Sequence, residues 1–362
     1  MGSRFKQGPQ SPEDQKMSGK SESIVSLQYL RALAAAMVLF EHTGDKSEQV
    51  GNHILAFYRH GYTGVDVFFV ISGFIMSFIF AKSPQGAASL ADFCRRRFVR
   101  IMPLYWVLSL VALGIFLASP GSVNSSGGDT AVWKSFLLIP GEGERFLIAN
   151  GWTLSYEMLF YAVFSLSFLA TTKGLGFAAA LLLVAVLGFA QSLGFFWPSP
   201  IVVEFSYGIA AYLLYRQLGP LLWSPVLMVL GAAGLIFQEV LVQTLPDARF
   251  LTAGLPAALL VYGAVSYEER LRGLPLRWLE KLGDSSYSMY LFHPFVLKAA
   301  GIVFAYAGLS RHGTWPEVFF WLATAVAVFG VSHLVYLYLE IPLIKLARRW
   351  FPSKARIASQ TA

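Results

Sequence analysis

Long apolar stretches separated by short polar or Gly/Pro-rich breaks recur from residue 26 to residue 339. A helix needs roughly 20 residues to cross a hydrocarbon core about 30 Å thick. Division of the chain at its polar breaks predicts ten crossing helices, at residues 26–43, 65–80, 101–118, 152–170, 175–191, 201–215, 221–237, 250–266, 286–305 and 317–339. The pattern has no internal repeat of fixed period. The sequence therefore predicts an all-α integral membrane protein with about ten transmembrane helices.

Composition supports a chain that lives in a bilayer. Of its 362 residues, 56% are hydrophobic and 14% are charged, whereas a soluble domain is roughly a quarter charged. The aromatic content of 15% fits belts of Trp and Tyr at the membrane interfaces. A water-soluble enzyme, a disordered chain and a secreted disulfide scaffold are excluded together, and the single cysteine leaves no cysteine metal cluster.

The Lys and Arg residues predict the orientation. With the N-terminus inside, the predicted inner segments carry 20 of them and the outer segments carry 6, as the positive-inside rule requires when both termini are cytoplasmic. The chain then divides into a flexible cytoplasmic tail at 1–23, a membrane domain at 24–349 and a cytoplasmic tail at 350–362. The net charge of +7 is assigned to this orientation and to membrane lipids, not to nucleic acid.

The first predicted helix contains two ionisable residues, Arg31 in its inner half and His42 at its outer end. Eleven residues correspond to about 16 Å of rise and to three turns plus about 20°, so both side chains leave the helix on one face. Such residues inside a membrane helix suggest a functional site. The alternative is that Arg31 snorkels to the inner interface while His42 caps the outer end.

A basic run with Arg95, Arg97 and Arg100 lies at the inner mouth of the third predicted helix. Arginines three or four positions apart present their guanidinium groups side by side, and guanidinium forks match phosphate oxygens. The run is therefore a candidate site for a nucleotide-like or pyrophosphate ligand that arrives from the cytoplasm. Orientation in the membrane and contact with lipid phosphates explain the same residues without a ligand.

Glu157 lies about one and a half turns below the outer surface in the fourth predicted helix. At the depth expected for His42, its carboxylate would orient the imidazole or bind a sugar hydroxyl; pairing with a buried arginine is the competing explanation. Further polar or aromatic residues of the predicted helices are candidates for cavity lining, with helix packing as the alternative: Asp66, Ser72, Trp152, Tyr290 and His293.

Six short motifs, in order along the chain, resemble the acyltransferase 3 family of integral membrane acyltransferases. They are Arg31 with ten residues before His42, Phe68-Phe-x-x-Ser-Gly73, Arg97-x-x-Arg100 before Pro103-x-Tyr105, Trp152-x-Leu-x-x-Glu157, Glu204-Phe-x-x-Gly208 and Ser286-Tyr-x-x-Tyr-Leu-x-His293. The opening from Leu27 looks most like the exopolysaccharide O-acetyltransferases of the family, of the succinoglycan type.

The resemblance implies transfer of an acyl group, usually acetyl, from cytoplasmic acetyl-CoA to a hydroxyl of an exopolysaccharide, cell-envelope or lipid-linked glycan, at the bacterial inner membrane and beside polysaccharide assembly proteins. Joined to the spacing, it assigns the CoA phosphates to Arg97 and Arg100, with help from Arg95 or Arg96, and the role of base to His42. Arg31 is a further catalytic candidate, which either contacts CoA or stabilises the developing negative charge. A polar tunnel would connect the two, with Glu157 fixing the imidazole. No metal is implied.

Two other classes of function stay open on the sequence. In a secondary transporter, Arg31, Glu157 and His293 would form a substrate site or relay at mid-membrane. The absence of visible repeated halves argues against it. In a scaffold or regulator of polysaccharide assembly the same residues would have lost their chemistry.

Overall fold

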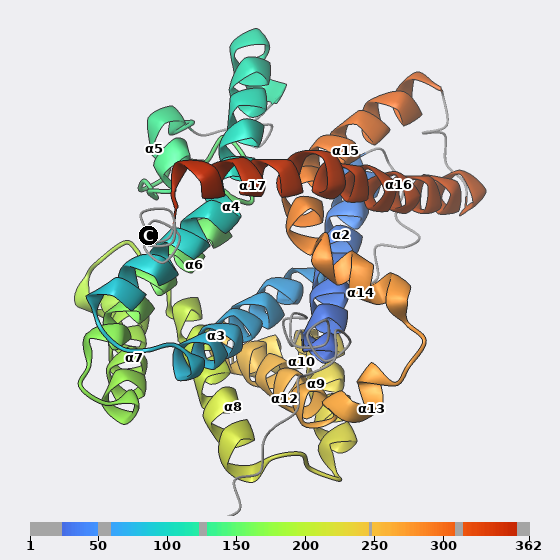
Figure 1. The fold of residues 1–362 in the computed structure, drawn as a ribbon. Coiled ribbons are helices and arrows are strands. Elements are labelled where there is room, and N and C mark those ends of the chain that lie inside the picture. Colours follow the sequence, from blue (N-terminus) through green and yellow to red (C-terminus); the bar gives the residue numbers. More distant parts are fainter. Residues whose placement is uncertain (1–23, 50–58, 123–128, 246–247, 308–313, 353–362) are drawn as a thin grey trace, which may run out of the picture.

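The computed structural model describes residues 24–49, 59–122, 129–245, 248–307 and 314–352. The predicted tail at 1–23 and most of the tail at 350–362 lie outside these described residues. Within them the chain is a bundle of helices (Figure 1), and the β structure found there is one isolated bridge between Thr130 and Arg145.

The helices are α2 (Val25–Gln49), α3 (Gly64–Lys82), α4 (Ala87–Ala118), α5 (Val132–Leu137), α6 (Gly151–Ser165), α7 (Lys173–Gly188), α8 (Glu204–Leu218), α9 (Ser224–Ile236), α10 (Gln238–Thr244), α11 (Arg249–Thr252), α12 (Gly254–Ser266), α13 (Glu268–Arg272), α14 (Arg277–Asp284), α15 (Ser286–Tyr306), α16 (Thr314–Val335) and α17 (Ile341–Trp350). Short 3₁₀ turns lie at Gly61–Thr63, Pro120–Ser122, Leu166–Leu169, Ala190–Leu193 and Pro200–Val203, and a π-helical turn lies at Tyr336–Glu340.

Each of the ten predicted stretches is helical, but the lengths differ from the prediction. The stretch predicted at 101–118 is only the second part of α4, which begins at Ala87. In the described residues five helices are long and apolar enough to cross a membrane, and a sixth if α9 and α10, bent by 70°, form one broken span. The protein is thus an all-α membrane protein.

Helix α2 is the centre of the bundle and packs against α3, α14 and α15 (Figure 1). Its first backbone N–H groups lack hydrogen-bond partners within the helix. A side chain from another helix accepts hydrogen bonds from two of them. The N–H groups of Val25 and Ser26 each donate to the Glu268 carboxylate over 2.8 Å. This contact holds the start of α2 in place, and α2 carries both Arg31 and His42.

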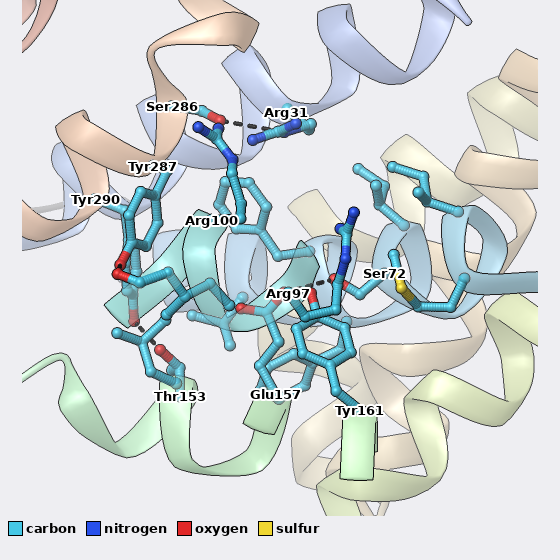
Figure 2. A pocket seen from close by; sticks show the side chains of 18 residues that line it. Arg31, Ser72, Arg97, Arg100, Thr153, Glu157, Tyr161, Ser286, Tyr287 and Tyr290 are labelled. Carbon is cyan, nitrogen blue, oxygen red and sulfur yellow. Dashed lines mark hydrogen bonds between the residues drawn. The ribbon is translucent and has the colours of Figure 1, made fainter. Parts of the chain in front are cut away.

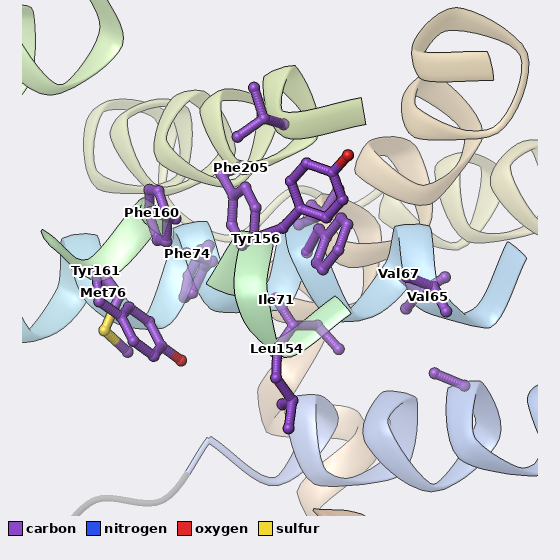
Figure 3. Close-up of a cluster of buried hydrophobic side chains, with 14 of the residues drawn as sticks. Val65, Val67, Ile71, Phe74, Met76, Leu154, Tyr156, Phe160, Tyr161 and Phe205 are labelled. Carbon is purple, nitrogen blue, oxygen red and sulfur yellow. The ribbon is translucent and has the colours of Figure 1, made fainter. Parts of the chain in front are cut away.

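Helices α3 and α8 cross in backbone contact. A Cβ at Gly73 would lie 2.1 Å from the Phe205 carbonyl oxygen, and a Cβ at Gly208 would lie 2.1 Å from the Val70 carbonyl oxygen. Side chains of α3, α6 and α8 form the apolar core around this crossing (Figure 3). In it the Phe205 ring stacks on that of Phe160, with centroids 4.2 Å apart. Glycine at both positions is therefore needed for helix packing.

Candidate active site

A cavity of about 130 Å³, which we call the arginine cavity, lies between α2, α3, α4, α6 and α15 (Figure 2). It brings together residues that the sequence places far apart. Its polar lining consists of Arg31, Ser72, Arg97, Arg100, Thr153, Glu157, Tyr161, Ser286, Tyr287 and Tyr290. Since three arginines and one carboxylate belong to this lining, the cavity favours an anion.

The three arginines differ in how their charges are satisfied. Arg31 donates from Nε to the Ser286 hydroxyl over 3.2 Å, and Arg100 forms an ion pair with the buried Glu340. Arg97 Nε is buried and has no hydrogen-bond partner in the structure. An unpaired buried N–H of a cation costs free energy, so Arg97 has unused capacity to bind a phosphate or another anion.

The partner of Arg100 is placed by an irregular helical turn. Pro342 has no N–H to donate to the carbonyl four residues earlier, and the chain before it forms the π-helical turn Tyr336–Glu340. At the end of this turn the Glu340 carboxylate accepts hydrogen bonds from Arg100 and from Ser288.

Glu157 lies in the arginine cavity and not beside His42. Its Oε1 accepts hydrogen bonds from the Ser72 hydroxyl, over 3.1 Å, and from the Tyr161 hydroxyl. The expectation that Glu157 orients the imidazole is therefore corrected. Residue spacing had placed Glu157 at a depth in its own helix, but the depth of α6 relative to α2 is set by packing that spacing does not reveal.

The imidazole of His42 is hydrogen-bonded to a second imidazole instead. His42 Nδ1 lies 3.0 Å from His293 Nε2, and His293 Nδ1 lies 3.1 Å from the Met289 carbonyl oxygen. Because a carbonyl only accepts, His293 Nδ1 carries the proton, and with both rings neutral its Nε2 accepts from His42 Nδ1. His42 Nε2 then keeps its lone pair, which is the form that a general base requires.

A layer of polar hydrogen bonds separates the arginine cavity from the histidine pair. Pro294 leaves the Tyr290 carbonyl without its helical partner, and Asn150 Nδ2 donates to that carbonyl over 2.8 Å. The Thr153 hydroxyl donates to the Asn150 carbonyl and so accepts from the Tyr290 hydroxyl, at 2.7 Å. None of the cavities described here is lined by both Arg31 and His42, so none of them is by itself the predicted tunnel.

Two larger cavities meet His42 on the other side of this layer. The first, of about 700 Å³, lies between the loop at 140–149, the start of α6 and residues 196–197, and Trp152 lines it. The second, of about 370 Å³, is lined by both members of the histidine pair and by Asp45, Lys46 and Lys298. His42 therefore lines two cavities that are larger than the arginine cavity and have different lining residues.

Two predicted site residues lie outside these cavities. Asp66 is fully buried and forms a bidentate ion pair with Arg249, with N···O distances of 3.0 and 2.7 Å. This pair ties α3 to α11, so Asp66 is a structural residue here and not cavity lining. Arg95 donates to Asp92 on its own helix over 2.7 Å and to the Phe351 carbonyl, which removes it from the predicted phosphate set.

Sequence reasoning missed Asn150 and Trp197. A donor to the carbonyl that Pro294 frees was to be expected. That the residue before α6 supplies this donor depends on tertiary packing, which residue spacing does not reveal. Trp197 lies in a segment without regular helical pattern. Among the described residues, no group of three His, Cys, Asp or Glu side chains is arranged to hold a metal ion.

Comparison with known proteins gives one family and several relatives. The profile of the acyltransferase 3 family, described as an acyltransferase domain, matches residues 24–337. Exopolysaccharide production protein ExoZ of Rhizobium meliloti is 34% identical over 320 residues, covering 83% of this chain and 94% of the relative. Acyltransferase MdmB of Streptomyces mycarofaciens is 29% identical over 373 residues, covering 90% and 93%.

A more distant relative is the peptidoglycan O-acetyltransferase OatA of Listeria monocytogenes. It is 23% identical over 372 residues, which cover 89% of this chain and 56% of the relative. No solved structure matches the chain significantly.

Proposed function

The chain belongs to the acyltransferase 3 family, and from this premise we propose that it moves an acetyl group from cytoplasmic acetyl-CoA to a hydroxyl of an exopolysaccharide or other envelope sugar. The names of two relatives support a glycan acceptor, since one acts in exopolysaccharide production and another acetylates peptidoglycan. The observation that carries the proposal is the placement of an arginine cavity and a histidine base along one helix, α2.

The donor end of the proposal is the arginine cavity. Arg97, with its unpartnered Nε, and Arg31 supply positive charge for the CoA phosphates. At about 130 Å³ the cavity equals the liquid volume of roughly four waters. It therefore accommodates a phosphate group or a section of the pantetheine arm, while the adenosine stays in the cytoplasm.

The acceptor end is His42. Its Nε2 takes the proton of the sugar hydroxyl as the hydroxyl oxygen attacks the thioester carbonyl. The new C–O bond forms and the C–S bond breaks, and the imidazolium returns the proton to the departing CoA thiolate. His293 holds His42 in the tautomer with a free Nε2, and the ester product leaves on the outer side.

For the thioester to reach His42, the layer at Tyr290 has to open. The layer is a chain of hydrogen bonds between Tyr290, Thr153 and Asn150, and each bond contributes about 1 kcal/mol net. An arm that carries amide groups replaces such bonds with its own. Opening therefore costs little once acyl-CoA is bound, and it is unfavourable without it.

We further propose that 24–349 is one membrane domain that crosses the bacterial inner membrane ten times, with both ends in the cytoplasm. The excess of Lys and Arg on the predicted inner segments supports this orientation. It places the arginine cavity toward the cytoplasm and His42 toward the outside, so CoA does not leave the cell. Polysaccharide assembly proteins are the expected neighbours.

The test uses the purified full chain in lipid nanodiscs with acetyl-CoA and envelope glycan extracted from a deletion strain. The wild type should release free CoA thiol and form glycan ester in equal amounts, whereas a transporter releases no thiol.

His42→Ala should lower the rate about 10²- to 10⁴-fold. Arg97→Ala should raise the KM for acetyl-CoA, while Arg216→Ala, which removes an exposed arginine of α8, should not. Wild-type acetylation by His42→Ala would overturn the mechanism.

A further inference from the structure

The cavity of about 700 Å³ beside His42, which we call the aromatic cavity, has the size of a site for a small molecule. Its volume falls within the range of roughly 300–1,000 Å³ typical of such sites. It is lined by His42, by the loop at 140–149 with the start of α6, and by Phe196 and Trp197. Three segments distant in sequence thus meet around a space that the donor half of the mechanism does not use.

One wall of this cavity is a row of aromatic rings. Trp152 and Tyr156 are one turn apart on α6, with ring centroids 6.0 Å from each other. The Tyr156 ring lies 5.7 Å from that of Trp197, and its hydroxyl accepts a hydrogen bond from the Ser199 N–H over 3.2 Å. The row is thereby anchored between a regular helix and the segment that follows α7.

Another part of the lining is polar. The loop before α6 contributes the carboxylates of Glu142 and Glu144, and Asn150 and Ser155 contribute an amide and a hydroxyl. Lys134 pairs with Glu144 and holds it in place. Carboxylates and amides accept hydrogen bonds from hydroxyl groups, so the cavity offers aromatic faces and acceptors to the same ligand.

A pyranose ring needs both kinds of surface. Its axial C–H groups are electron-poor and pack on the negative face of an aromatic ring, while its equatorial hydroxyls require hydrogen-bond partners. The neighbouring cavity of about 370 Å³ is less suitable, because Lys46 and Lys298 line it and its aromatic side chains are His42, His293 and Phe295. Of the two cavities that reach His42, the aromatic cavity matches a sugar.

We propose that the aromatic cavity binds a pyranose unit of the acceptor glycan, stacked on Trp152 and Trp197, with the hydroxyl to be acylated directed at His42. The assignment rests on the proposed function, which it extends by naming the surface that selects the acceptor. Trp152 and Trp197 are then binding residues for the sugar, and they have no part in holding acetyl-CoA.

The experiment measures ester formation from radiolabelled acetyl-CoA against increasing amounts of envelope glycan from the deletion strain. Trp152→Ala and Trp197→Ala should each raise the glycan concentration for half-maximal rate by about tenfold, which corresponds to the loss of one aromatic contact. The KM for acetyl-CoA should stay at the wild-type value. Trp152→Phe, which keeps a ring, should recover most of the glycan affinity.

The matched control is Trp133→Ala, since Trp133 lies on α5, is exposed, and does not line the aromatic cavity. It should leave both half-maximal concentrations unchanged. If Trp152→Ala and Trp197→Ala keep the wild-type glycan dependence, the sugar site is wrong while the proposed activity stands. If the wild type forms no ester at all, the proposed function itself fails. An unchanged KM for acetyl-CoA in the variants separates a lost sugar contact from misfolding.

Discussion

The tautomer of a single histidine decides how this site can work. The Met289 carbonyl fixes the proton of His293 on Nδ1, and the free Nε2 of His293 then fixes the proton of His42 on Nδ1. A carboxylate in the place of His293 would hold the same tautomer and also stabilise a charged imidazole. In the proposed mechanism the neutral pair instead makes His42 a base that readily passes the proton taken from a hydroxyl on to a thiolate.

Replacement of His293 should therefore impair the chemical step more than it impairs binding. In His293→Ala the His42 Nδ1–H loses its acceptor, and the ring is free to turn. We expect kcat to fall by about 10- to 100-fold, the loss typical when a group that orients a histidine is removed. The KM for acetyl-CoA should not change, because His293 does not line the arginine cavity. Steady-state kinetics in nanodiscs measure both values.

The conservative variant His293→Gln is the control, since its amide oxygen can accept from His42 while its NH₂ donates to a carbonyl. It should recover much of the lost kcat. Equal activity of His293→Ala and the wild type would show that His42 needs no orienting partner.

The candidate site was predictable in its residue types but not in its pairings. Arg31, Arg97 and Arg100 stand out in the sequence because a cation inside a membrane helix costs free energy and cations beside a helix indicate its orientation. The structure brings all three into one cavity. His293, and not Glu157, forms the hydrogen bond to His42. Spacing fixes the face of a helix on which a residue lies. It does not fix the height of one helix against another, on which each pairing depends.

Among the helices, the crossing of α3 and α8 is a contact that tolerates little change. In Gly208→Ala the new methyl would lie 2.1 Å from the Val70 carbonyl oxygen and 2.7 Å from the Phe74 nitrogen, which are backbone atoms. The helices must separate, and we expect a loss of about 1–3 kcal/mol in the free energy of unfolding. Thermal unfolding of the purified protein in detergent measures the change.

Gly114→Ala on α4 provides the comparison for this variant. A Cβ at Gly114 would meet no atom within 4 Å, and alanine is the better helix former by about 0.5–1 kcal/mol. The melting temperature of Gly114→Ala should stay level or rise, whereas that of Gly208→Ala should fall. Similar melting temperatures for the two variants would refute the tight crossing.

The cap at the start of α2 should make stability depend on pH. Burial raises the pKa of Glu268, but hydrogen bonds from Ser26, Val25 and Arg272 outweigh this effect, and the pKa lies below its ordinary value of 4.5. A lowered folded-state pKa contributes stability above pH 4.5 that is lost as the pH falls through the folded pKa. Glu268→Gln should cost about 1 kcal/mol at neutral pH.

The pH dependence shows whether Glu268 stabilises the protein through its charge or through its packing. The difference in melting temperature between the wild type and Glu268→Gln should shrink at acidic pH, as the wild-type carboxylate takes up its proton. Glu269→Gln, at the exposed neighbouring position, should melt like the wild type throughout. A difference that stays constant down to about pH 3 would assign the effect to packing and not to the carboxylate.

The existence of the helices was predictable, whereas their lengths and breaks were not. Continuous apolar stretches are enough to locate α3, α12 and α15, since the membrane requirement acts on each stretch by itself. The extension of α4 to Ala87 and the π-helical turn at Tyr336–Glu340, just before Pro342, do not follow from the apolar pattern. The second is held by the pair of Arg100 and Glu340, which joins helices 240 positions apart.

At the scale of the whole molecule, the proposed reaction requires two faces with different access. An acyl donor made in the cytoplasm must reach Arg97, and a sugar outside must reach His42. Helices α6, α7 and α8 decide whether this holds, because they are 15, 16 and 15 residues long and fall short of the usual crossing length. If any of them fails to cross, the segments after it change sides.

Cysteine labelling at the breaks around these three helices tests the sides directly. In a Cys94→Ser background, one cysteine is placed in turn at Glu142, Gly174, Phe195 and Arg216, all on exposed positions. Ten crossings predict that an impermeant maleimide labels positions 142 and 195 in cells with the outer membrane opened. Positions 174 and 216 should be labelled only after the inner membrane is permeabilised.

Each failure of this alternation has a separate structural meaning. Labelling of Gly174→Cys from outside would make α6 a re-entrant helix, and His42 and Arg97 would then lack the barrier that the transfer needs. Protection of both Gly174→Cys and Phe195→Cys, together with labelling of Glu142→Cys, would instead make α7 the helix that does not cross. The aromatic cavity would then fail as an outer site, because it needs Trp197 and the loop at 140–149 on the same side of the membrane. The labelling pattern thus tests the geometry on which donor and acceptor access both depend.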